Sequence, residues 1–167
     1  MLTYPLLIIF PALMAFVAAS DLLTMRISNR LVLISAAAFP ILALIAGMPL
    51  ELIGLHIGAG LAILAVTFGV FAAGWIGGGD AKIAAVIAMW MGFGLVLPFL
   101  LYASVLGGVL TLVIIIGRRY MLPAPLLQVG WIYKLHSPKT GIPYGIALAG
   151  AAMLLYPTTF IFQALAA

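Results

Sequence analysis

The most restrictive feature of this sequence is the length of its uncharged stretches. Asp, Glu, Lys and Arg are absent from residues 1–20, 31–50, 52–79, 83–117 and 140–167. A transmembrane helix needs roughly 20 mostly apolar residues to cross the bilayer core. Charged residues make up 6% of the chain, whereas a soluble domain carries about 25%, so there are too few to cover a water-facing surface. The sequence therefore predicts an all-α integral membrane protein.

The number of membrane crossings depends on residues 83–117, which are far too long for one crossing and barely long enough for two. Cytoplasmic loops carry an excess of Lys and Arg. Two crossings, with a turn near Gly92, Gly94 and Pro98, place the basic residues on one face: Arg26, Arg30, Lys82, Arg118, Arg119, Lys134 and Lys139. We therefore expect one membrane domain over residues 1–167, with six transmembrane helices and both termini on the outer, periplasmic side.

Two further segments are assigned from their charges and prolines. Nothing basic precedes the apolar core of residues 1–20, and the first positive charge is Arg26. We therefore expect these residues to remain as a helix rather than to be removed as a signal peptide. Residues 120–133 are uncharged but contain Pro123 and Pro125, which are unfavourable inside a helix. We expect an interfacial loop there.

Composition also limits the chemistry and the partners. The chain has no cysteine, which excludes a disulfide framework, a thiol nucleophile and a Cys-x-x-Cys metal site. We expect neither a metal nor a cofactor. The net charge of +4 fits membrane orientation and anionic headgroups better than a polynucleotide. The expected environment is the lipid bilayer, with no nucleic acid partner.

The chain has only three acidic residues, Asp21, Glu51 and Asp80. Glu51 falls in a short outer loop and is expected to be a solvated charge. Asp21 and Asp80 each lie where a predicted span meets the cytoplasmic face, and spans one and four can pack side by side, so the two carboxylates can approach one another. Two structural alternatives stay open: Asp21 as a helix end, and Asp80 as an N-cap.

The sequence around Asp80 favours a functional role. Asp80 follows Gly77, Gly78 and Gly79, and successive glycines allow unusual backbone conformations and the close approach of another chain. The run lacks the Lys-Ser/Thr of a phosphate-binding loop. It does match the Gly-x-Gly-Asp signature of intramembrane aspartic proteases, although four residues alone are a weak signal.

Three motifs together resemble the type IV prepilin peptidase family, in particular its short members that serve Flp/Tad pili. Residues 21–29 (DLLTMRISN) look like the first aspartate box of the family, with Ser28 at its usual proline. Residues 77–82 (GGGDAK) look like the second box, and residues 141–145 (GIPYG) look like the Ile-Pro-Tyr-Gly element. The resemblance covers nearly the whole chain, in the same order and with the same topology.

The resemblance implies an aspartic endopeptidase in the bacterial inner membrane that removes the leader from prepilins at the cytoplasmic face. Its catalytic pair maps onto Asp21 and Asp80. The bifunctional members carry a cysteine-rich insert after the first span, and this chain has none, so we do not expect N-methyltransferase activity. Gly77, Gly78 and Gly79 are expected to keep the approach to Asp80 open.

Two carboxylates that share a site hold one proton between them, because both cannot ionise cheaply. Lys82 and Arg26 are candidates either to orient this pair or to bind anionic lipid headgroups. We assign no role to His56 or His136, since a lone histidine in a membrane is more often hydrogen-bonded between helices. A small proton-coupled transporter, with Asp21 and Asp80 as relay groups, is the main alternative, and a scaffold subunit is another.

Overall fold

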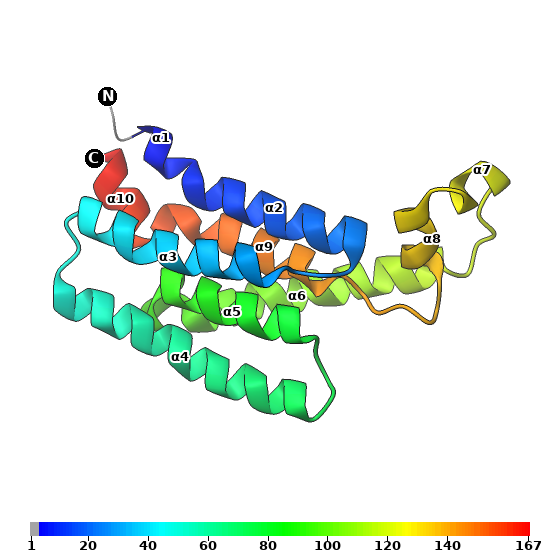
Figure 1. The fold of residues 1–167 in the computed structure, drawn as a ribbon, viewed down its shortest axis with the longest axis horizontal. Helices are drawn as coiled ribbons and strands as arrows, with labels where there is room; N and C mark the ends of the chain where they lie inside the picture. Colours follow the sequence, from blue (N-terminus) through cyan, green and yellow to red (C-terminus); the bar gives the residue numbers. More distant parts are fainter. Residues whose placement is uncertain (1–3) are drawn as a thin grey trace.

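The computed structural model describes residues 4–167, and this part of the chain is helical and free of strands. The main helices lie along the long axis of the molecule (Figure 1): α2 (Ile9–Thr24), α3 (Asn29–Ile45), α4 (Leu50–Ala72), α5 (Gly78–Met91), α6 (Phe93–Gly117) and α9 (Tyr144–Leu155). The short elements are α1 (Tyr4–Leu7), α7 (Ala124–Leu127), α8 (Gly130–His136), η1 (Tyr156–Thr158) and α10 (Phe160–Ala166). The expected all-helical class is confirmed.

Fewer helices reach full membrane length than the sequence predicts. Within residues 4–167, three are long and apolar enough to cross a bilayer: Pro5–Thr24, Leu50–Ala72 and Phe93–Gly117. A fourth is reached if Tyr144–Thr158 and Phe160–Ala166, bent by 49° at Thr159, form one span. Helices α3 and α5 have 17 and 14 residues, so each falls short of the roughly 20 residues of a typical span. The count of six crossings stays a prediction.

The predicted division of residues 83–117 occurs at Gly92. This residue ends α5 and precedes α6 with φ +67° and ψ 169°, a conformation that favours glycine. A Cβ atom at Gly92 would also lie 2.5 Å from Nε2 of His56. The other ring nitrogen of His56, Nδ1, is 2.9 Å from the Met89 carbonyl of α5, which is the hydrogen bond between helices that is common for a lone histidine. Pro98 lies inside α6 and makes no turn.

The expected loop over residues 120–133 is partly wrong. It contains α7, and α8 begins at Gly130. Pro123 is the N-cap of α7 and Pro125 lies in its first turn. A proline is tolerated there, because the backbone N–H groups of the first turn have no partner within the helix. The prolines therefore start a short helix rather than prevent one. Helix α8 then packs against α2 and α6.

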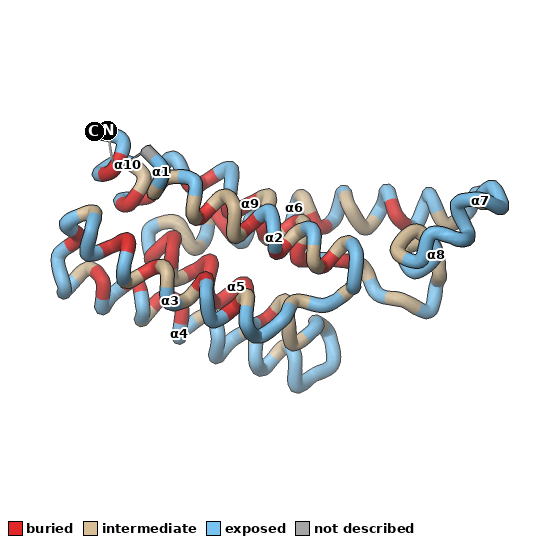
Figure 2. The backbone as a smooth tube through the Cα atoms, turned by 45° about the horizontal axis from the view of Figure 1, so that its top comes forward, coloured by how far each residue is buried: buried red, intermediate tan, exposed pale blue. Residues whose placement is uncertain are grey.

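The most buried helix is α5. It packs against α3, α4, α6 and α9, and Figure 2 shows its buried residues in red. Alanines at positions 81, 84, 85 and 88 let its neighbours approach closely. At its far end, Trp90 packs on Phe10 with ring centroids 4.5 Å apart and donates its indole N–H to the Ser35 carbonyl. Helix α9 packs against α2, α5 and α6, which brings the start of α9 and the start of α5 toward the end of α2.

Candidate active site

Asp21 is held in place at the last turn of α2. The helix ends at Met25, whose left-handed backbone (φ 56°) lets its N–H donate to the Asp21 carbonyl at 2.8 Å. The hydroxyls of Ser20 and Thr24 donate to the Arg26 carbonyl just beyond. The Asp21 side chain is buried, with 5% of its surface exposed. Its Oδ2 accepts a hydrogen bond of 2.7 Å from the Gly145 backbone N–H at the start of α9.

Asp80 lies in the first turn of α5, three residues after the N-cap Gly77. It precedes the predicted span that begins at residue 83 and is partly buried. Burial and, second, the charge of Asp21 raise the pKa of Asp80 to about 6, while a hydrogen bond from the Gly77 backbone lowers it. The influence of Asp21 means that the structure brings the two carboxylates within electrostatic reach of one another.

The three glycines before Asp80 are needed for space rather than for unusual backbone angles. Among the described residues, the glycines with positive φ are Gly47, Gly74 and Gly92, so the expected special conformation in the run is wrong. The expected close approach is present. A Cβ at Gly79 would lie 3.2 Å from Cβ of Ile27, which belongs to the α2–α3 connection. A Cβ at Gly77 would lie 3.0 Å from Oδ2 of Asp80.

A cavity of about 790 Å³ opens beside Asp80. Its walls come from α4, the α4–α5 connection, α5, α6, the segment that precedes α9 and the start of α9. They include Thr67, Gly77, Ser104, Arg118 and Tyr144. Asp80 lines this cavity, whereas Asp21 is buried beside Gly145. The site therefore has one carboxylate that faces an accessible space and one that is fixed to the backbone of α9.

The two basic candidates make other contacts. Nζ of Lys82 donates to Oδ1 of Asn29 at 3.0 Å, which ties α5 to the first turn of α3. Arg26 is exposed and enters the site through its backbone carbonyl, which accepts the two hydroxyl hydrogen bonds described above. Their expected roles, to orient the aspartate pair or to bind lipid headgroups, stay predictions.

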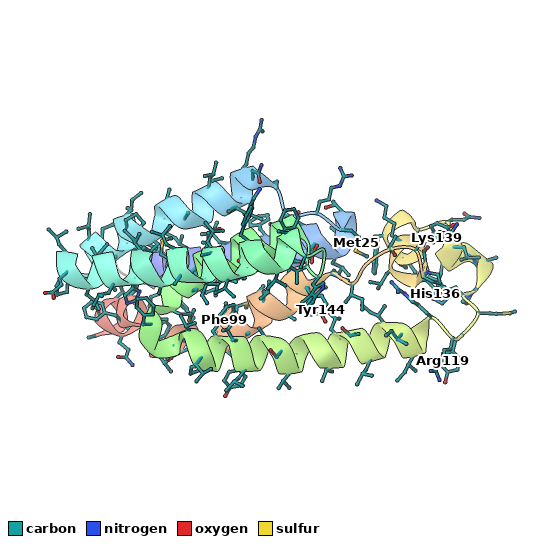
Figure 3. The ribbon with its side chains drawn as sticks, turned by 90° about the horizontal axis from the view of Figure 1, so that it is seen from below. Met25, Phe99, Arg119, His136, Lys139 and Tyr144 are labelled. Carbon is teal, nitrogen blue, oxygen red and sulfur yellow. The ribbon has the colours of Figure 1, made fainter. Side chains whose placement is uncertain are left out.

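Sequence reasoning missed the role of Gly145. A Cβ there would lie 2.8 Å from Oδ2 of Asp21 and 2.9 Å from Cδ1 of Ile27, so the position has room for glycine only. The signal in the sequence is the motif of residues 141–145, which contains Gly145. Figure 3 shows Met25 and Tyr144 at the same end of the bundle. Met25 lies one helical turn after Asp21, and Tyr144 directly precedes Gly145.

The comparison with known families agrees with this geometry. The sequence model of the type IV leader peptidase family matches residues 8–112, a range that contains both aspartates. The chain belongs to the type IV leader peptidase family, whose members are aspartic-type endopeptidases. A search of the curated proteins and of the solved structures found no match. Membership of this family implies activity on prepilins.

The Gly145 contact yields a test with a matched control. We expect Gly145→Ala to lower prepilin cleavage by about 100-fold, because its methyl group displaces Asp21 and a misplacement of about 1 Å costs that much. Gly108→Ala, in α6, should change little, since nothing lies within 4 Å of a Cβ at that position and Gly108 is not among the residues that line the cavity. Cleavage is measured per folded, monodisperse protein. Equal rates for the two variants would mean that the position of Asp21 does not depend on Gly145.

Proposed function

We propose that this chain is a prepilin leader peptidase in which Asp21 and Asp80 form the catalytic dyad. The observation that carries the proposal is their arrangement at one end of the bundle. The Gly145 N–H holds Asp21 at 2.7 Å, and Asp80 faces a cavity large enough for a peptide segment. A lone N-cap role does not explain Asp80, because Gly77 occupies the N-cap position of α5.

The reaction follows from two carboxyl groups that share one proton. The ionised carboxylate takes a proton from a water molecule, whose oxygen attacks the scissile carbonyl carbon. The protonated carboxyl donates its proton to the carbonyl oxygen, which gives a tetrahedral gem-diol. In the collapse of this intermediate, one gem-diol hydroxyl gives its proton to the ionised carboxylate, the C–N bond breaks, and the amine nitrogen takes the proton of the other carboxyl. The pair ends with one proton, ready for another cycle.

The cavity supports a substrate that enters in an extended form. Its lining is mostly apolar, and Thr67, Ser104 and Arg118 contribute polar groups to the same cavity as Asp80. Gly77 adds no side chain between the cavity and the carboxylate, since even a methyl group there would lie 3.0 Å from Oδ2 of Asp80. A peptide backbone can therefore reach the dyad without displacing a side chain at this position.

We further assign the chain to the short members of the family that serve Flp/Tad pili. Only residues 25–28 connect α2 to α3, which leaves no room for a cysteine-rich insert at that position. The chain is also free of cysteine. We place the protein in the bacterial inner membrane with the aspartates at the cytoplasmic face.

Six crossings, with both termini outside, are the topology that the charges favour. The connections over residues 25–28, 73–77 and 118–143 lie at one end of the molecule, and α10 and the α3–α4 connection lie at the other (Figure 1). The seven basic residues fall in or next to the first group, as expected for cytoplasmic loops.

Removal of either carboxylate tests the dyad. We expect Asp21→Asn and Asp80→Asn each to lower leader removal by at least about 1,000-fold, with the double variant no worse, because residues that act as a unit are not additive. Glu51→Gln makes the same acid-to-amide change at an exposed residue of α4 and should stay near wild type. Cleavage of a co-expressed prepilin is followed by gel and mass measurement. Near-normal activity in either aspartate variant would make that residue structural.

The topology has its own test. A reporter fused after Lys139 should report the cytoplasm, because it follows the cluster of basic residues, and one fused after Ala167 should report the outside. The fused reporter is an enzyme that is active on only one side of the membrane, and its activity is measured for both fusions. The same location for both fusions would exclude an odd number of crossings between these points and with it the six-span topology.

A further inference from the structure

Arg118 makes an unusual set of contacts just after α6 ends. Its Nε donates to the Leu135 carbonyl at 2.9 Å, and its Nη2 donates to the carbonyls of Thr140 and Gly141, each at 3.1 Å. A guanidinium is a planar fork of donors that can hold several acceptors at fixed angles. These contacts fasten the end of α8 and the segment that precedes α9 to the end of α6.

The fastened segment forms a wall of the cavity. Residues 140–142, Tyr144 and Arg118 itself line the space beside Asp80. Ile142 accepts the Tyr144 N–H at 2.9 Å, and the next residue is Gly145, which donates to Asp21. A shift of residues 140–141 therefore also moves the Gly145 N–H, which holds Asp21.

A second attachment of this segment lies earlier in α6. The Tyr144 hydroxyl is 3.2 Å from Oγ1 of Thr111. The Tyr144 ring packs where a Cβ at Gly107 would come within 2.7 Å of it. With Arg118 at one point and Thr111 at the other, α6 fixes both ends of the segment 140–144.

From these contacts we propose that Arg118 is a positioning residue of the peptidase: it holds residues 140–144 as the wall of the substrate cavity and so keeps Gly145 on Asp21. This inference rests on the proposed function, since it concerns the same site. It also gives the α7–α8 segment a defined connection. The contacts with Leu135, Thr140 and Gly141 join the two ends of residues 119–140 beside the end of α6.

The neighbouring arginine provides a matched control. Arg119 has the same charge and is exposed at the end of α6 (Figure 3). We expect Arg118→Gln to lower kcat by about 10- to 100-fold, because Asp21 is no longer held in the productive geometry. KM should rise as well, because the wall of the cavity loosens. Arg119→Gln should leave both constants close to wild type. Arg118→Lys, which retains the charge but not the fork, should fall between them.

A spectroscopic measurement separates positioning from a general loss of stability. The chain has no cysteine, so Gly141→Cys introduces a single site for a spin label, at a position where a Cβ meets nothing within 4 Å. Arg118→Gln should add a mobile component to the spectrum of this label in monodisperse protein, and Arg119→Gln should not. Arg118→Lys should give a smaller mobile component, and it serves as the variant to measure if Arg118→Gln does not fold.

The outcomes are distinct. A mobile label together with lower kcat supports the proposal. Lower kcat with an immobile label would overturn it, since Arg118 would then act on the substrate directly, and a mobile label with normal kcat would overturn it too. If Asp21→Asn and Asp80→Asn keep their activity, the proposed function fails instead, whatever the label shows.

Discussion

The contact between the end of α2 and the start of α9 is the constraint on which the rest of the site depends. It joins Asp21 to Gly145, which are 124 residues apart in the chain, through one hydrogen bond of 2.7 Å. The bond forms only because Gly145 has no side chain, since a Cβ there would lie 2.8 Å from the carboxylate. Asp80 then completes the site from α5, which packs against α9. A buried carboxylate requires such partners, because an unpaired one is costly.

The few charged residues leave most of the bundle to be held together by other contacts. A bilayer-embedded bundle gains little from the hydrophobic effect between helices, so it depends on close packing of small residues. The alanines of α5 and Gly60, where a Cβ would lie 2.9 Å from Met89, are examples. Polar contacts such as Lys82 with Asn29 and Arg118 with three carbonyls occur where the helices end.

Sequence patterns predicted the helical class and the break at Gly92, because hydropathy and glycine act locally. The pairing of Asp21 with Asp80 was inferred from the motifs and the family resemblance, and it stays a prediction that the influence of Asp21 on the pKa of Asp80 supports. The structure adds a role for Ser28 that the sequence analysis did not assign: its hydroxyl caps α3 by accepting the Leu31 N–H. The position of α9 between α2, α5 and α6 was not predictable, since it depends on how each helix is rotated. For the same reason the directions faced by Gly77 and Gly79, and the role of Arg118, required the structure.

The central claim is that Asp21 and Asp80 act as one coupled pair, and a titration tests it most directly. They are the only two aspartates in the chain, so protein labelled with carbon-13 at the aspartate carboxyl gives two NMR signals, one from each member of the pair. Asp80 has a pKa raised to about 6, in part by the charge of Asp21. In Asp21→Asn that charge is gone, so the titration of Asp80 should move to lower pH. A midpoint for Asp80 that is the same in the wild type and in Asp21→Asn would contradict the pairing.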